Sequence, residues 1–112
     1  MELLVLILKK VSLMDELMRA LAKGGIKGAT IVDGEGMGEA LINMEDLPMF
    51  GLLRRVMEGE EKDQSKVIMF ILDDEKMITA RNIIKDIIGD INAPNTGIMF
   101  AMPVTYVEGI GE

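Results

Sequence analysis

The chain has 112 residues, enough for one domain with a hydrophobic core, and 49% of them are hydrophobic while only 4% are aromatic. The formal net charge of -7 argues against nucleic acids and anionic membrane surfaces as partners, because binding them requires a net basic surface. Because the sequence holds neither Cys nor His, disulfides, thiolate chemistry, soft-metal sites and His-based catalytic triads are excluded as well.

The first predicted element is a strand at Leu3–Leu8, where every residue is apolar. Two later segments, Val67–Leu72 and Ile98–Val104, have the same character. Strands with one face in water alternate apolar and polar residues, so short continuous runs indicate strands buried on both faces. Lys9-Lys10 follow the first run, which is also too short for a signal peptide or a membrane span. We therefore expect a cytoplasmic protein without membrane insertion.

A helix is predicted next, with Ser12 as its N-cap and Asp15 three residues later in a capping-box-like position. Gly24-Gly25 is expected to end this helix, because glycine readily takes the left-handed conformation of a helix C-terminus. The chain then returns as a predicted strand at Ile26–Val32, which completes a strand–helix–strand unit. The helix carries one apolar face, formed by Leu13, Met14, Leu17, Met18 and Leu21.

Glycines alternate with other residues in Gly34–Gly38, which reads G-E-G-M-G directly after that strand. The spacing differs from a dinucleotide fingerprint, and no helix is predicted to follow with its N-terminus toward a ligand. A P-loop is excluded because the Lys-Ser/Thr pair is missing, and an EF-hand is disfavoured because Met44 stands at the bidentate position. Spacing alone favours a flexible strand exit with left-handed residues.

A long excursion, residues 39–66, separates the two halves of the chain. Connections much longer than about 4–6 residues are usually functional or disordered. Asp46 is expected to cap a short helix within the excursion, and the polar stretch Glu58–Gln64 is predicted to be mobile. The apolar surface of this helix either recognises a partner or packs on the protein itself; it comprises Met49, Phe50, Leu52, Leu53, Val56 and Met57.

The second half repeats the first, beginning with the strand Val67–Leu72. Asp73 or Asp74 is expected to cap the next helix, and the acidic run that they form with Glu75 is interpreted as capping and dipole complementarity. Gly89 is expected to stop the helix, and a turn-rich stretch leads to a strand at Ile98–Met102. The apolar helix face comprises Met77, Ile84, Ile87 and Ile88.

The predicted order βαββαβ is that of the ferredoxin-like fold, an α+β fold with one antiparallel four-stranded sheet and two helices on one face. We expect a single domain over residues 1–112, with a long loop protruding at about 39–66. Two helices cover only one face of the sheet, so the other face of these apolar strands requires further copies of the chain. Tyr106 is expected to pack against a neighbouring subunit. The sequence assembles no nucleophile, base and oxyanion hole, so no catalytic or metal-binding residues are predicted.

Two motifs resemble those of the nitrogen-regulatory P-II signalling proteins. The first is Gly25–Ile31 (G-I-K-G-A-T-I) with Gly36–Gly38 behind it, similar to the family's G-h-x-G-h-T strand and its G-F-G at the base of a long protruding loop. The second is Gly97–Val104 (G-I-M-F-A-M-P-V), which is similar to the family's G-K-I-F-V-h-P-V strand. The resemblance covers most of the chain outside the 39–66 loop.

This resemblance implies a compact homotrimer that binds adenine nucleotides in three clefts between subunits and docks its loop onto a protein partner. Two departures concern phosphate binding: Ile98 replaces the family's Lys, and no Lys or Arg follows Lys85, so the family's R-x-R-T-G-E segment is absent. We therefore expect ATP to bind weakly unless Lys9, Lys10 or Lys66 supplies the charge, and a ligand with fewer phosphates to bind comparably or better. Carried over by position, the cleft residues are Gly28, Thr30, Gly36, Met37 and Gly38 on one side and Gly97 on the other.

The leading hypothesis is a non-enzymatic regulator that senses a small molecule at its subunit clefts and acts on a protein partner through the 39–66 loop. The loop holds no Tyr, so the uridylylation known in the family has no acceptor. Two alternatives stay open: a ligand-independent adaptor that grips a partner with the loop, and a small ferredoxin-like enzyme that works with carboxylates. Divalent-cation-tolerance proteins share the trimeric fold, but the missing His and Cys weaken any copper role.

Overall fold

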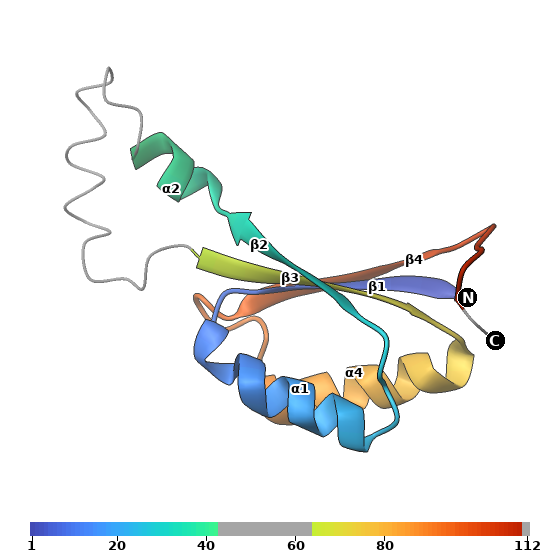
Figure 1. Cartoon of the computed structure of the whole chain (residues 1–112). Helices are drawn as coiled ribbons and strands as arrows, with labels where there is room; N and C mark the ends of the chain where they lie inside the picture. The colour runs from blue at the N-terminus through green and yellow to red at the C-terminus, as the bar shows by residue number, and fades with distance from the viewer. Residues whose placement is uncertain (43–63, 111–112) are drawn as a thin grey trace.

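The computed structural model describes residues 1–42 and 64–110, and its elements follow a βαββαβ series (Figure 1). The first half contains β1 (Glu2–Leu8), the 3-10 turn η1 (Val11–Leu13), α1 (Met14–Lys23), β2 (Thr30–Glu35) and α2 (Met37–Ile42). The second half contains β3 (Gln64–Leu72), α4 (Asp74–Ile88) and β4 (Gly97–Pro103).

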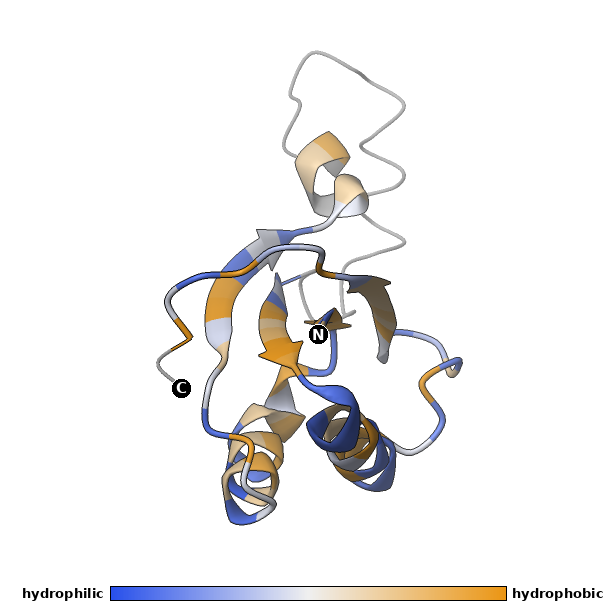
Figure 2. Ribbon diagram, turned by 90° about the vertical axis from the view of Figure 1, so that its right-hand side faces the viewer, coloured by the Kyte–Doolittle hydropathy of each residue, from blue (hydrophilic) through white to orange (hydrophobic). Residues whose placement is uncertain are grey.

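The four strands form one antiparallel sheet in the order β2-β3-β1-β4. Figures 1 and 2 show α1 and α4 side by side on the same face of this sheet, where the two helices contact each other. This two-layer arrangement is ferredoxin-like, and the predicted fold class is confirmed.

The hydrophobic core lies between the helices and the sheet. Alternate residues of a strand point to opposite faces, so β1 and β3 each send every second side chain toward the helices. These strand residues are at most 5% exposed: Leu4, Leu6, Leu8, Ile68, Phe70 and Leu72. The helices contribute Leu17, Leu21, Met77, Ala80 and Ile84. Full burial of one large aliphatic side chain stabilises the fold by about 1.5–3 kcal/mol, so this layer is the main source of stability.

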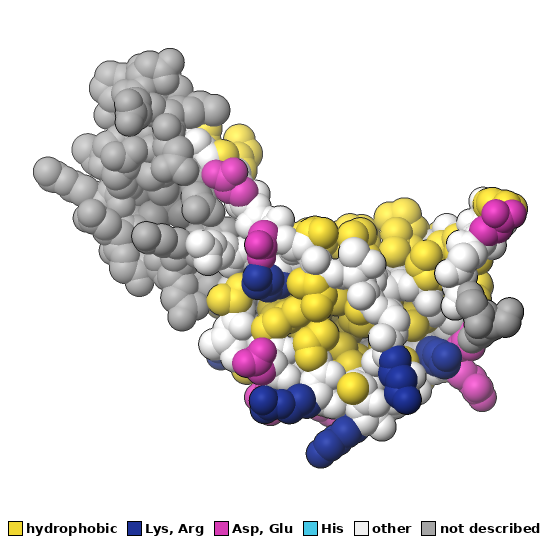
Figure 3. Space-filling view, in the orientation of Figure 1, with side chains coloured by type: hydrophobic (Ala, Val, Ile, Leu, Met, Phe, Trp, Pro, Cys, Tyr) yellow, Lys and Arg dark blue, Asp and Glu magenta, His cyan; other side chains and the backbone are white. Residues whose placement is uncertain are grey.

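The helix-free side of the sheet, called the open face below, is apolar as well. The register of the strands places Val5 between Met69 and Phe100 on this side. Phe100 is 42% exposed, and hydrophobic side chains gather along the helix-free side in Figure 3. The open face also contains Leu3, Ile7, Val32, Val67, Ile71, Ile98 and Met102. Over residues 1–42 and 64–110, the inference that two helices leave one apolar sheet face uncovered is confirmed.

The N-terminus of α1 differs from the prediction. Winding begins earlier, in η1, where the Leu13 N–H donates to the Lys10 carbonyl at 3.1 Å. The N-cap of α1 is Leu13, and no side-chain hydrogen bond caps either η1 or α1. The prediction that Ser12 caps this helix is wrong, because Ser12 lies inside the first turn and not at its boundary.

A Schellman motif closes the C-terminus of α1. The Ile26 N–H donates to the Leu21 carbonyl at 2.9 Å, the Gly25 N–H donates to the Ala22 carbonyl at 3.1 Å, and Gly25 has a φ of +89°. The predicted glycine stop is therefore confirmed. The strand predicted from Ile26 instead begins at Thr30, because the Ile26 backbone completes the helix cap and its side chain, 5% exposed, enters the core.

The second half follows the sequence interpretation closely. The Asp73 carboxylate caps α4 by accepting from the Lys76 N–H at 2.8 Å, and Gly89 ends the helix with a φ of +77°. The expected strand that follows begins at Gly97, one residue before its predicted start. Both βαβ units are therefore present as predicted.

Both ends of the 39–66 excursion belong to regular elements. α2 occupies Met37–Ile42 and projects away from the sheet beyond β2 (Figure 1), although no helix is predicted there. Its signal in the sequence is the i, i+3, i+4 spacing of Met37, Ala40 and Leu41. β3 already begins at Gln64. The helix predicted after Asp46, and the acidic run that follows it, lie outside the described residues.

Candidate functional site

The segment Gly34–Gly38 carries the chain directly from β2 into α2. Gly34 lies within the strand opposite Ser65, and a Cβ on Gly34 would lie 2.5 Å from the Ser65 Oγ. The Gly36 carbonyl accepts from the Ala40 N–H at 3.0 Å, which starts the helix. The glycines therefore serve close cross-strand packing and a tight strand-to-helix connection.

This geometry corrects the interpretation of the segment as a flexible exit with left-handed residues. Among the described glycines, positive φ angles fall at Gly25, Gly89 and Gly109. The side chain of Met37, which begins α2, is 78% exposed. The segment thus presents a thioether to its surroundings at the base of the loop.

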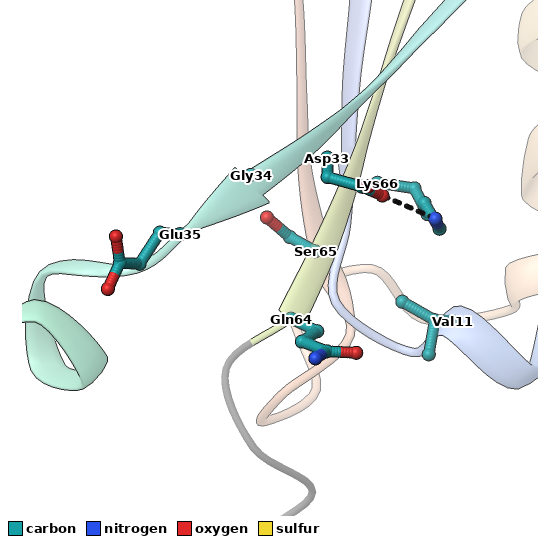
Figure 4. Close-up of a pocket in the computed structure, with 7 residues that line it drawn as sticks. All are labelled: Val11, Asp33, Gly34, Glu35, Gln64, Ser65 and Lys66. Atoms are coloured by element: carbon teal, nitrogen blue, oxygen red, sulfur yellow. Dashed lines mark hydrogen bonds and ion pairs between the residues drawn. The ribbon is translucent and has the colours of Figure 1, made fainter.

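A pocket of about 360 Å³ opens beside this segment, where β2 ends and β3 begins (Figure 4). Asp33 is paired in register with Lys66, and Glu35 with Gln64, so these four side chains belong to the same side of the sheet. Val11 of η1 contributes an apolar wall, as Figure 4 shows. Gly34 and Ser65 complete the lining.

Charge in this pocket is arranged around an ion pair in which the Lys66 ammonium donates to the Asp33 carboxylate. The Asp33 side chain is 84% exposed, so the pair contributes no more than about 0–1 kcal/mol to stability. Within the described part of the chain, no ion pair or hydrogen bond engages the Glu35 carboxylate. Two carboxylates and one ammonium give the pocket a formal charge of -1.

The start of β4 forms a second tight corner on the opposite edge of the sheet. A Cβ on Gly97 would lie 2.7 Å from the Ile7 carbonyl oxygen, so this position accepts only glycine without a shift of the backbone. The Thr96 carbonyl accepts from the Lys9 N–H at 3.0 Å and from the Lys10 N–H at 3.3 Å. The basic Lys9-Lys10 pair is therefore anchored next to Gly97.

The six residues predicted to line a nucleotide cleft fall on both edges of the sheet. Gly28 precedes β2 and Thr30 begins it; Gly36, Met37 and Gly38 follow its end; Gly97 begins β4. β2 and β4 are separated by β3 and β1, so the two edges lie about 14 Å apart. Within the β2 group, Thr30 and Gly36 are about 20 Å apart along the strand. One chain by itself does not bring the two sides of the predicted cleft together.

Tyr106 stands outside both corners, with a side chain that is 73% exposed. Its hydroxyl donates to the Glu108 carboxylate. This hydrogen bond, and to a smaller extent desolvation, raises the pKa of Tyr106 above its ordinary value of 10.0. The phenol is thus a proton-holding donor and not an activated nucleophile. Its packing against a neighbouring subunit stays a prediction.

Over residues 1–42 and 64–110, no group of three or more acidic side chains is placed to hold a metal ion. No helix within these ranges is both long and apolar enough to cross a bilayer. The pocket was not predicted from the sequence, although the alternation of Asp33 and Glu35 around Gly34 indicates two carboxylates on one side of a strand.

These features define a ferredoxin-like domain with a polar pocket at one end of its sheet, beside the α2 helix that follows β2. A family model, Nitrogen regulatory protein P-II, matches residues 1–111, and the chain belongs to this family. A search of curated proteins gives no match. P-II proteins are regulators in signal transduction and not enzymes, so the family establishes a regulatory role and confirms the resemblance seen in the sequence.

Proposed function

We propose that this protein is a homotrimeric, cytoplasmic small-molecule sensor that regulates a protein partner through its 39–66 loop. The P-II family match supports the signalling role, and the uncovered open face is the observation that carries the assembly. Each ligand cleft would lie between the β2 edge of one subunit and the β4 edge of the next. The proposed cleft residues are Gly28, Thr30, Gly36, Met37, Gly38 and Gly97.

The open face supports assembly because it offers uncharged, apolar contact area. Ile98, Phe100 and Met102 of β4 are 50%, 42% and 44% exposed in the single chain. Monomeric proteins rarely leave a contiguous apolar patch of this kind in water. Further copies that bring the same face together would bury these side chains and would place the β2 and β4 edges of different subunits next to each other.

We propose an adenine nucleotide with few phosphates as the ligand. Ile98 stands where the family has a phosphate-gripping Lys, and Lys66 is already engaged by Asp33. A hydrogen bond to a charged group contributes about 1.5–3 kcal/mol, so losing two of them weakens binding at least about 10²-fold. Lys9 and Lys10, beside Gly97, are the cations best placed to compensate.

Assembly and ligand are tested together on the full chain. Light scattering at low micromolar concentration should give three chains per particle. Thermal-shift measurements with AMP, ADP and ATP at equal concentration should then show stabilisation by AMP or ADP at least as large as by ATP. A monodisperse monomer would contradict the assembly, and tight magnesium-dependent ATP binding would contradict the ligand preference.

The reporter role of the loop is tested by replacing residues 44–63 with a short Gly/Ser connector. If the segment recognises a partner, the trimer and its melting temperature should stay nearly unchanged while the specific partner is no longer bound. A strongly destabilised or aggregating variant would show instead that the segment packs on its own trimer. Partner binding that is the same with and without a saturating ligand would favour the ligand-independent adaptor.

A further inference from the structure

In the pocket between β2 and β3, the basic side chain is already paired with a carboxylate. Among the described residues that line the pocket, Lys66 is the one basic side chain, and its ammonium is bound to Asp33. Figure 4 shows Glu35 at the other end of the pocket, turned away from this pair. The pocket therefore combines a neutralised cation with a second carboxylate.

This arrangement determines which ligands can enter at low cost. A polyphosphate would have to displace Asp33 from Lys66 and would still lie close to Glu35, and like charges that share one small pocket repel. An ammonium group meets the opposite situation, because Glu35 can accept its hydrogen bonds without disturbing the existing ion pair. The ammonium group then compensates the pocket's formal charge of -1.

We propose that this pocket binds a small aliphatic ammonium compound and excludes polyphosphates, with Asp33 as the specificity-determining residue. Glu35 accepts one ammonium group, the side-chain oxygen of Gln64 opposite it accepts from a second N–H donor, and Val11 contacts the aliphatic part. Asp33 acts by holding Lys66 away from anions. The inference rests on the proposed function only in assigning small-molecule sensing to this end of the molecule.

The experiment is an NMR titration of the isotope-labelled full chain at constant ionic strength, with 1,4-diaminobutane and inorganic tripolyphosphate as separate probes. The backbone signals of residues 33–35 and 64–66 report the pocket. In the unmodified protein, diaminobutane should shift them saturably and tripolyphosphate should not. In Asp33→Asn/Glu35→Gln, whose pocket has a formal charge of +1, diaminobutane affinity should fall at least 10-fold and tripolyphosphate should bind saturably.

A matched control makes the same two substitutions, Asp to Asn and Glu to Gln, just beyond the far end of β3. Asp74→Asn/Glu75→Gln, in the first turn of α4, alters the net charge equally about 26 Å from the pocket and should leave both titrations unchanged. Asp33→Asn alone, at a largely exposed position, should weaken diaminobutane binding and admit tripolyphosphate, and it keeps the test open if the double variant does not fold.

Three results would overturn the proposal. They are the absence of a saturable shift with diaminobutane, binding of tripolyphosphate to the unmodified protein as tightly as diaminobutane, and loss of diaminobutane binding together with gain of tripolyphosphate binding in the control variant. None of them bears on the light-scattering and loop-replacement tests of the proposed function. Conversely, a monomer with a diaminobutane-binding pocket would contradict the proposed trimer and support this inference.

Discussion

At the scale of single residues, two of the proposed cleft glycines, Gly97 and Gly28, differ in what the single chain requires of them. Gly97 is required by space, because a Cβ would lie 2.7 Å from the Ile7 carbonyl oxygen in the neighbouring strand. At Gly28, a Cβ would meet nothing within 4 Å, so the single chain gives no reason for glycine there. A requirement at Gly28 would have to come from a ligand or another subunit.

Alanine at these two positions should therefore have different effects. Gly97→Ala should lower the free energy of unfolding by about 1–3 kcal/mol, because the backbone must shift to accept the methyl group. Gly28→Ala should leave the stability unchanged or raise it slightly, since it restricts the unfolded chain. Denaturant titrations at one fixed protein concentration measure both variants. Equal losses for the two variants would contradict the steric argument.

Tyr106 offers a spectroscopic test, because the sequence contains one Tyr and no Trp. The hydrogen bond to Glu108 raises the pKa of Tyr106, since the carboxylate favours the protonated phenol and repels the phenolate. Glu108→Gln should lower this pKa toward 10.0, as followed by tyrosinate absorbance against pH. Glu16→Gln on α1 is the control and should leave the titration unchanged. An unaltered pKa in Glu108→Gln would show that the hydrogen bond is not formed in solution.

At the scale of elements, the two main helices begin in different ways. α4 is capped by a side chain, whereas α1 grows out of the η1 turn without any side-chain cap. Both helices end at a glycine-containing turn, with positive φ at Gly25 and Gly89. The helix stops are thus conventional, and the start of α1 is the exception.

This difference predicts unequal costs for two cap substitutions. Asp73→Ala should lower the free energy of unfolding by about 0.5–2 kcal/mol, because the Lys76 N–H loses its acceptor. Ser12→Ala should change it by no more than about 0.5 kcal/mol, because no cap depends on that side chain. Thermal or chemical unfolding distinguishes the two. A large loss in Ser12→Ala would mean that Ser12 caps α1 after all.

At the scale of the whole molecule, the two faces of the sheet differ in what covers them. One is covered by α1 and α4, whereas no helix of the described residues covers the open face, which is apolar (Figure 1). An apolar surface over the central strands β1 and β3 and the edge strand β4 is costly in water. The trimer proposed above removes that cost.

A charge on the open face should therefore prevent assembly. Phe100→Asp should convert the trimer to a folded monomer, because burying an unpaired carboxylate in an apolar interface costs several kcal/mol. Light scattering gives the mass, and circular dichroism shows that the fold is retained. Ile78→Asp, at a 54% exposed position on α4, is the control and should remain trimeric. A trimeric Phe100→Asp would place the interface elsewhere.

The amino-acid sequence by itself determined the βαββαβ order, the three apolar strands, the Asp73 cap, the helix stops and the family resemblance. These depend on periodicity and on neighbours within a few residues, which a linear pattern records. Only the tertiary structure decided that Ile26 joins the core and the α1 cap, and that Asp33 meets Lys66 across 33 positions of sequence. The physical reason is that the pocket and its charge follow from the β2–β3 register, which aligns two distant segments only when the sheet forms.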